Sequence, residues 1–292
     1  MLTRKDIARL LTSGVRTEFQ KGVSSIVNVY PQITTEIPST KAEEVYAWLG
    51  SNPRLREWKD ERRGKALLEK GFTLKNKDWE ATISVDRNAM DDDQYGQVKI
   101  RANTLGASAK KGYDEELATV IQAGETELCY DGQYYFDTDH SEGSSGSQSN
   151  YSASGLALSV ANAKTVITTM MAYKDDQGGI VGINPTHIMV PPALEFTARE
   201  IFDPQGTGDT NANTSLKGRL KIIVNVFLTE TTAWYVMDLN QPLKPFIFQN
   251  RKPLTLDTDD TDLFKKKVID FGVDARFAFG YGDWRQCYKA VA

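Results

Sequence analysis

The stretch AWLGSNPRLREWKDERRGKALLEKGFTLKNKDWE, residues 47–80, says more about the fold than any other part of the chain. Three tryptophans, Trp48, Trp58 and Trp79, lie in this strongly charged run, and a small local core could hardly bury all of them. One interpretation is a solvated helical hairpin with its aromatic side chains on the core side. The other is a protruding loop that packs on a neighbouring subunit, because Trp and Arg are enriched at the centres of protein interfaces.

The protruding-loop interpretation predicts which side chains contact a neighbouring subunit. They are the aromatic, leucine and arginine side chains of the run: Trp48, Leu55, Arg56, Trp58, Arg62, Arg63 and Trp79.

The residues before this run predict a helix followed by an extended arm. The helix is indicated by apolar residues at helical spacing after a possible cap at Thr3, namely Ile7, Leu10, Leu11 and Val15. From Gly22 to residue 41, Pro31 and Pro38 punctuate short apolar runs, which favours an extended arm rather than a packed element.

After the run, the sequence predicts a helical stretch within 95–123. Its last part has Asp114 as a cap and Gly124 as a stop. Gly106 and Gly112 weaken the case for one unbroken helix.

A Ser/Gly-rich run, 141–155, is typical of a linker and is interpreted as the boundary of a second lobe. In this lobe the patterns predict a helix from Leu156 to Met171, a strand at 186–190 and a helix that ends near Phe202. A loop at 203–215 and a β-rich end follow, with strands at 219–228, 232–239, 244–250, 264–279 and 284–290. The fold class is therefore α+β.

Composition argues against several classes of function. The 292 residues carry a net charge of −4, from 35 Lys and Arg against 39 Asp and Glu, whereas proteins that bind nucleic-acid phosphates tightly usually have a basic excess.

Cys129 and Cys287 are too few for a disulfide framework, which favours free thiols in a reducing compartment. The chain shows no N-terminal apolar signal core and no run near the ~18 apolar residues of a membrane span. We therefore expect it to be made, and to stay, in the cytoplasm of the producing cell.

The catalytic inventory is poor. The two histidines are His140 and His187, and the cluster from Asp137 to His140 offers metal-type ligands without a second histidine nearby. A polar turn is the favoured interpretation of this cluster, and a metal-dependent hydrolase built on it is a distant alternative. The aspartates between 257 and 262 are expected in a loop that lacks the Gly and Glu of a calcium site. No phosphate-binding or nucleophile motif occurs, so the sequence predicts no catalytic, metal or cofactor site.

Six runs of the chain resemble, in the same order, segments of the major head subunit of Mu-like phages and prophages. They are AWLGxxPxLREW (47–58), NKxxExTI (76–83), CYDGQxxFDxxH (129–140), NPTHIxVP (184–191), KPFIFQxRKP (244–253) and ARxxxGxGxW (275–284).

The resemblance implies the fold shared by tailed-phage and herpesvirus shells. On this fold the chain divides into an N-terminal arm (1–41), an extended loop (42–90), a peripheral domain with a spine helix and a long β-sheet (91–150), an axial domain (151–243) and C-terminal strands that return to these domains (244–292). The loop at 203–215 would lie near the symmetry axis.

The resemblance also implies a function and partners. Copies of the chain would form hexamers and pentamers of an icosahedral shell that encloses phage double-stranded DNA, contacted weakly and non-specifically. Because the chain starts directly with its arm, a separate scaffolding protein is expected, with portal and decoration proteins as further partners. The chain would end in the virion after assembly in the host cytoplasm. An encapsulin-like compartment or a gene-transfer particle is the alternative with the same fold.

Overall fold

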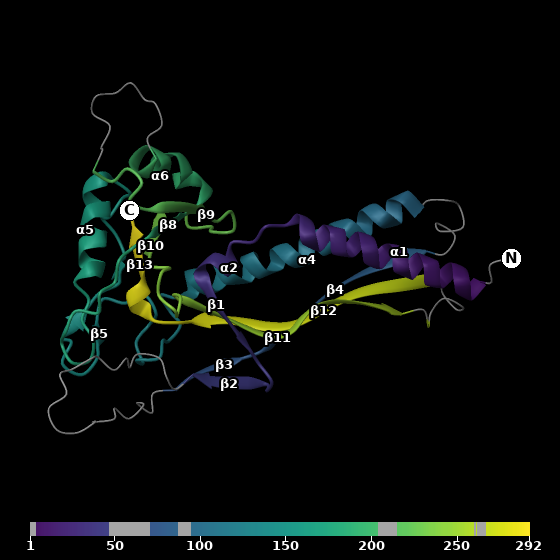
Figure 1. Ribbon diagram of the computed structural model, residues 1–292, viewed down its shortest axis with the longest axis horizontal. Helices are drawn as coiled ribbons and strands as arrows, with labels where there is room; N and C mark the ends of the chain where they lie inside the picture. Colours follow the sequence, from purple (N-terminus) through teal and green to yellow (C-terminus); the bar gives the residue numbers. More distant parts are fainter. Residues whose placement is uncertain (1–3, 47–70, 87–94, 204–214, 260, 262–266) are drawn as a thin grey trace.

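A computed structural model describes residues 4–46, 71–86, 95–203, 215–259, 261 and 267–292. It has an elongated arm, which is a larger unit than the predicted N-terminal arm (1–41), joined to a compact lobe. The first described residues lie at the far end of this elongated arm and the C-terminus lies in the lobe (Figure 1). Residues 203–215 were expected to form a loop, and most of that range lies outside the described residues. None of the helices in the described ranges is long and apolar enough to cross a membrane.

The arm is built on a four-stranded sheet in the order β1-β11-β12-β4. Its two long strands, β11 (Phe246–Asp259) and β12 (Val268–Tyr281), are antiparallel. β1 (Thr34–Pro38) joins β11 in parallel, and β4 (Lys77–Asp86) pairs antiparallel with β12. Alternate residues of β12 are buried, including Ile269, Phe271 and Val273, because side chains of a strand alternate between its two faces.

Helices α1 (Arg4–Ser25) and α4 (Tyr95–Ala123) lie side by side along the sheet (Figure 1). α4 is continuous, so its glycines do not interrupt it. A Cβ on Gly106 would lie 2.2 Å from the carbonyl oxygen of Phe19, and one on Gly22 would lie 2.0 Å from that of Asn103. These glycines therefore let the two backbones approach more closely than any other residue would allow.

Asp114 lies inside α4 and does not cap it, contrary to the prediction. Its carboxylate accepts hydrogen bonds from the backbone N–H groups of Val29 and Tyr30 at 2.9–3.1 Å and from the Asn28 side chain at 2.9 Å. It thus caps the short helix α2 (Tyr30–Ile33) from another element. The predicted stop is confirmed, since α4 ends at Ala123, directly before Gly124.

The lobe is built on a second sheet in the order β7-β13-β10-β8-β9. Its strands are β7 (Tyr151–Ser152), β8 (His187–Val190), β9 (Lys221–Val224), β10 (Ala233–Met237) and β13 (Cys287–Val291). Its helices are α5 (Val160–Met171), α6 (Glu195–Phe202) and the 3₁₀ turns η1 (Pro192–Leu194) and η3 (Trp284–Gln286). The predicted helices and strands of this lobe are confirmed, although several are shorter than expected.

Three segments differ from the predictions. Residues 22–41 are packed, because β1 is a strand of the long sheet and Ile33 is fully buried. The Ser/Gly-rich run 141–155 is not a plain linker, since it contains β7 and parts of the short pair β5 (His140–Ser141) and β6 (Ser147–Gln148). Residues 257–259 continue β11 rather than forming a loop. β1 pairs with β11 and β7 with β13, both far away in the sequence, whereas β5 and β6 are close neighbours within a run whose composition suggests a linker.

The described ends of the chain on either side of residues 47–70 are β-strands. β2 (Glu43–Tyr46) and β3 (Phe72–Lys75) pair antiparallel as a narrow ribbon on the side of the long sheet away from α1 and α4 (Figure 1). The helical-hairpin interpretation is therefore wrong for these ends, and residues 47–70 between them lie outside the described residues.

Among the described residues, buried apolar side chains form two hydrophobic clusters. The larger one continues from the lobe into the near end of the arm, through residues such as Trp234, Tyr235 and Phe248. The smaller one lies at the far end, where Val15 and Phe19 of α1 meet Phe271 of β12. The arm is thus a thin layered element whose far end has a modest core of its own.

Candidate functional site

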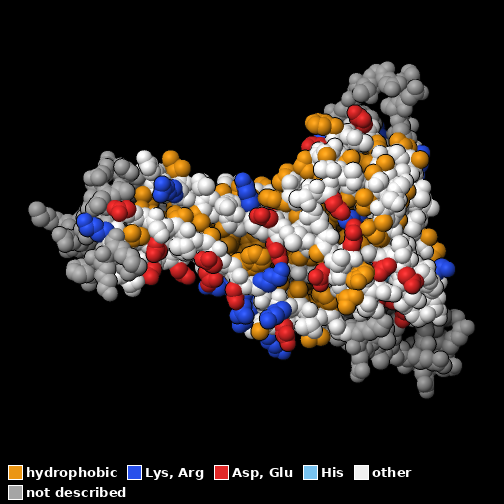
Figure 2. Space-filling model, turned by 180° about the vertical axis from the view of Figure 1, so that it is seen from behind, with side chains coloured by type: hydrophobic (Ala, Val, Ile, Leu, Met, Phe, Trp, Pro, Cys, Tyr) orange, Lys and Arg blue, Asp and Glu red, His pale blue; other side chains and the backbone are white. Residues whose placement is uncertain are grey.

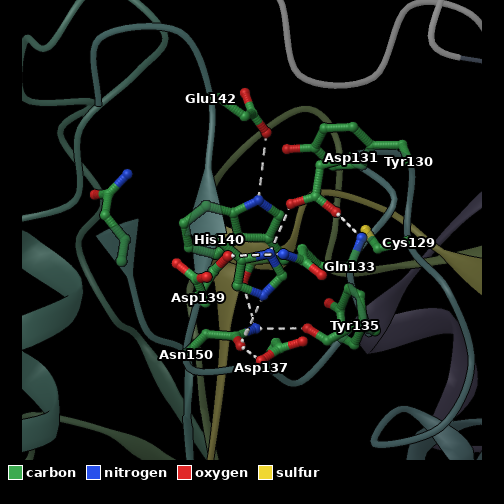
Figure 3. A network of polar contacts seen from close by, with 12 residues as sticks. Cys129, Tyr130, Asp131, Gln133, Tyr135, Asp137, Asp139, His140, Glu142 and Asn150 are labelled. Carbon is green, nitrogen blue, oxygen red and sulfur yellow. Dashed lines mark hydrogen bonds and ion pairs between the residues drawn. The ribbon is translucent and has the colours of Figure 1, made fainter. Parts of the chain in front are cut away.

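His140 of the aspartate–histidine cluster singled out in the sequence belongs to a network of polar contacts (Figure 3), whereas Asp137 is half-buried and Asp139 exposed. His140, at the start of β5, is fully buried. Its Nδ1 lies 2.7 Å from Oδ2 of Asp131, and its Nε2 lies 3.1 Å from Oδ1 of Asn150. Its ring stacks on Trp284 with centroids 4.0 Å apart and planes at 7°.

A second group of buried charges adjoins the first. Arg285, next to Trp284 on η3, binds Glu142 at 2.6 Å and Asp283 at 3.1 Å, and donates to the hydroxyl of Tyr130 at 2.9 Å. Glu142 also accepts from the indole N–H of Trp284 at 3.4 Å. The loop 129–150 is thereby joined to the C-terminal segment 283–287 through paired charges, which is how buried charges are tolerated.

The cluster does not form a metal centre. The carboxylate of Asp139 accepts from the Ser147 hydroxyl at 2.7 Å, and that of Asp137 accepts from the Thr138 N–H at 2.6 Å. Within the described ranges, no three His, Cys, Asp or Glu side chains are grouped so that they could hold a metal ion. The distant alternative of a hydrolase built on His140 therefore has no support in the geometry.

The other reactive side chains are also held in structural positions. His187 on β8 lies 2.8 Å from the hydroxyl of Thr186, and burial, followed by the charge of Lys221, lowers its pKa. Cys129 and Cys287 are free and buried, and burial raises the pKa of both thiols. A thiol needs its thiolate form to react as a nucleophile, so neither position suits covalent catalysis.

A buried lysine forms a third polar link. Lys289 of β13 is fully buried, pairs with both Glu125 and Glu230, and lies over the ring of Tyr235. It connects the turn after α4 to the strand that ends the chain.

Of the predicted contact residues, Trp79 is the one that lies in the described ranges; Trp48, Leu55, Arg56, Trp58, Arg62 and Arg63 lie outside them. Trp79 on β4 stacks on Phe277, with centroids 5.2 Å apart and planes at 15°, and its indole N–H donates to the Phe277 carbonyl at 3.3 Å. One face of the ring therefore packs within its own subunit. The same residue also lines a groove between α4 and the sheet.

This groove has a volume of about 390 Å³. Its apolar lining includes Trp79, Leu254 and Phe277, and its acidic side chains are Glu80, Glu115 and Glu116. On the face shown in Figure 2, basic and acidic side chains are interspersed rather than gathered into one basic surface. That face is therefore not the kind of surface that holds nucleic acid tightly.

The sequence analysis did not identify three residues that complete the polar network around His140. Asn150 lies in the Ser/Gly-rich run, and Trp284 and Arg285 come 134 and 135 residues later. The one available signal was the recurrence of polar and aromatic residues in the CYDGQ and GDWR segments, which gave no hint of their mutual contact.

A family model described as Mu-like prophage major head subunit gpT matches the chain at residues 8–158, 151–228 and 224–292. The "Mu-like prophage FluMu major head subunit" of Haemophilus influenzae is 30% identical over 287 residues, which cover 97% of this chain and 72% of that protein. The "Major capsid protein" of Escherichia phage Mu is 24% identical over 305 residues, which cover 78% of this chain and all of that protein.

Solved structures with the same fold are shell proteins. The procapsid of bacteriophage JBD30 matches with a TM-score of 0.62 and 25% identity over 99% of this chain and 76% of that chain. The JBD30 capsid decorated with minor capsid protein trimers matches with a TM-score of 0.56 and 20% identity, over 93% of this chain and 66% of that chain. A virus-like particle from Pyrococcus furiosus matches with a TM-score of 0.56 and 9% identity, over 95% of this chain and 98% of that chain.

Proposed function

This chain belongs to the family of Mu-like prophage major head subunits, and from that membership we propose how its copies build a shell. It is a major capsid protein of a phage head, a structural protein and not an enzyme. The fold alone would not distinguish a phage head protein from the shell protein of another particle, because the shell protein of a virus-like particle from Pyrococcus furiosus shares this fold at 9% sequence identity. Family membership favours the phage head over an encapsulin-like or gene-transfer particle.

The proposal is that the chain forms hexamers and pentamers that close into an icosahedral shell around double-stranded DNA. The observation that carries it is the shape of the subunit, a long thin arm with a compact lobe at one end (Figure 1). Such a shape offers a large lateral surface per residue. Repeated head-to-tail contacts close into rings when the rotation between subunits allows it, and many weak contacts then act together.

In this proposal the parts of the subunit follow the predicted segments only partly, because α1 and β1 come from the predicted arm (1–41) and β4 from the predicted loop (42–90). The four-stranded sheet with α1 and α4 is the peripheral part, and the five-stranded lobe is the axial part at the centre of each capsomer. The β2–β3 ribbon is the base of the extended loop, and residues 47–70 beyond it reach a neighbouring subunit. Trp79, which stacks on Phe277, anchors the strand that follows this base.

The proposal also includes other components of the particle. We infer a separate scaffolding protein, a portal and decoration proteins, the last because a related capsid is decorated with minor capsid protein trimers. DNA would be contacted weakly, in keeping with the net charge of −4. Assembly would take place in the host cytoplasm.

Electron microscopy and sedimentation velocity of the purified protein, alone and co-expressed with neighbouring head genes, test the proposal. We expect capsomers, tubes or closed shells at micromolar concentration. A species that stays monomeric at every concentration, ionic strength and combination of partners would contradict it.

A further inference from the structure

The groove beside Trp79 lies at the border of the long sheet. Residues of α4 and β4 line it, together with Leu254 of β11 and two residues of β12. β4 is the last strand in the order β1-β11-β12-β4, and within the described ranges no strand pairs with its other edge. The groove therefore lies at a side of the subunit that a neighbouring molecule can approach.

The hollow exists because small residues meet where α4 and β4 face each other. Ala81 lies on the same side of β4 as Trp79, because side chains alternate along a strand, and a Cβ on Gly112 of α4 would have nothing within 4 Å. Trp79 itself is half-buried, stacks on Phe277 and also lines the groove. Apolar surface that stays open and is bordered by polar residues is typical of protein–protein contacts.

The rim of the groove is acidic. Glu80 of β4 and Glu115 of α4 are exposed, whereas Glu116 is nearly buried and pairs with Lys77 at 2.7 Å. Among the described residues that line the groove there is no lysine or arginine. A molecule that fits this groove should therefore offer apolar side chains to its centre and basic side chains to its rim.

The segment 47–70 has this composition. It contains Trp48 and Trp58, four leucines, and seven Lys or Arg against four Asp or Glu. The segment is thus basic in a chain whose net charge is −4. Trp and Arg are also the side chains that most often anchor protein interfaces.

We propose that the groove between α4 and β4 is the receiving site for the basic, tryptophan-containing segment 47–70 of a second copy of the chain. The proposal rests on the shell function and on the neighbour contact proposed above, and it adds the place on the neighbour where this contact lies. Apolar side chains of the segment would cover the open apolar surface beside Trp79. Its arginine side chains would lie against Glu80 and Glu115, where opposite charges fix the register of the contact.

The position of the groove favours a second copy over the segment's own subunit. β2 and β3, which come directly before and after the segment, pair on the side of the long sheet away from α4 (Figure 1). The groove, in contrast, lies on the α4 side of the sheet. To enter the groove of its own subunit the segment would have to turn around the edge of the sheet, whereas a subunit placed beside β4 brings its segment to this edge directly.

Filling the groove tests the proposal without altering a charge. Gly112→Met puts a side chain into space that is open in the free subunit, so we expect its denaturation midpoint to stay at the wild-type value or to rise. The same variant should raise the critical concentration for assembly about tenfold or more, because an apolar anchor is excluded. Thr104→Met, exposed on the same helix and outside the groove, is the control and should assemble like the wild type. Wild-type assembly of Gly112→Met would overturn the proposal.

A charge exchange between copies identifies the occupant. Glu115→Lys alone, and Arg62→Glu with Arg63→Glu, should each raise the critical concentration, because like charges then meet in the contact. An equimolar mixture of these two variants should assemble more readily than either, since alternating copies restore opposite charges. In the control, Glu127→Lys, exposed and outside the groove, replaces Glu115→Lys. That mixture should assemble no more readily than Glu127→Lys alone.

The remaining outcomes contradict the proposal in different ways. If the mixture shows no recovery but the three substitutions in one chain do, the segment lies in the groove of its own subunit. If the substitutions act only when other head proteins are co-expressed, one of those proteins is the occupant. If wild-type shells form and no variant changes their assembly, the groove assignment fails and the shell function stands. Without any wild-type assembly, both fail.

Discussion

At the scale of single residues, the structure gives roles that depend on partners distant in the sequence. Gly106 and Gly22 allow the helix contact between α1 and α4, since any side chain there would meet backbone atoms. Asp114 caps a helix to which it does not belong. Asn150 satisfies three carbonyl groups from inside a run that looks like a flexible linker.

Two glycines of the same helix should respond oppositely to alanine. In Gly106→Ala the added Cβ would lie 2.2 Å from the Phe19 carbonyl oxygen, whereas at Gly112 nothing lies within 4 Å. We expect Gly106→Ala to lower the free energy of unfolding by about 1–3 kcal/mol through overpacking, and Gly112→Ala to raise it by about 0.5–1 kcal/mol through helix propensity. Urea denaturation of the subunit measures both. Equal effects would mean that the close helix contact does not exist.

Replacing Asp114 should loosen the segment between α1 and the long sheet. Asp114→Ala removes the acceptor for the N–H groups of Val29 and Tyr30 and for Asn28. We expect a loss of about 1–3 kcal/mol, because buried donors are left without partners. Hydrogen exchange should show faster exchange at these two amides. Unchanged exchange there would show that other groups hold the segment.

At the scale of elements, the charged run 47–80 has two parts. Residues 47–70 are predicted to reach a neighbouring subunit, and residues 71–80 include β3 and the start of β4. Trp79 packs on Phe277 of its own sheet. We expect Trp79→Ala to lower the stability of the free subunit by about 1–3 kcal/mol. Trp58→Ala should change it by less than about 0.5 kcal/mol, while weakening assembly by about 2 kcal/mol. Thermal unfolding of subunits and the critical concentration for assembly measure the two effects.

The reverse pattern would favour a loop folded on its own subunit. Limited trypsin digestion separates the two cases independently of any variant. Cleavage at Arg62 and Arg63 should be fast in free subunits and suppressed in assembled particles. Equal protection in both states would refute the neighbour contact.

Elements with a strong periodic pattern could be predicted from the sequence, and elements defined by distant partners could not. α5, β8, α6 and the C-terminal strands follow from spacing and turn residues. β1 was missed because Pro31 and Pro38 suggest an extended arm, yet it is an edge strand, where proline is tolerated. The run 141–155 was misread because its serines and glycines suggest a linker, while buried Asn150 organises it. The site around His140 was found as a cluster, but its partners Trp284 and Arg285 were not.

At the scale of the whole molecule, the thin arm and compact lobe make sense as parts of a larger assembly. The arm has a small core at its far end and an apolar groove with acidic side chains beside α4. In the proposed shell each lateral contact between subunits need contribute only a few kcal/mol, because many contacts act together.

A cryo-electron microscopy map of assembled particles tests the central claim most directly. The account predicts closed shells of hexamers and pentamers, with the lobes around the capsomer axes and residues 47–70 of each subunit lying on the arm of another. Closed shells in which these residues fold back on their own subunit would contradict the assigned contact. The absence of any ordered assembly under all conditions would contradict the shell function itself.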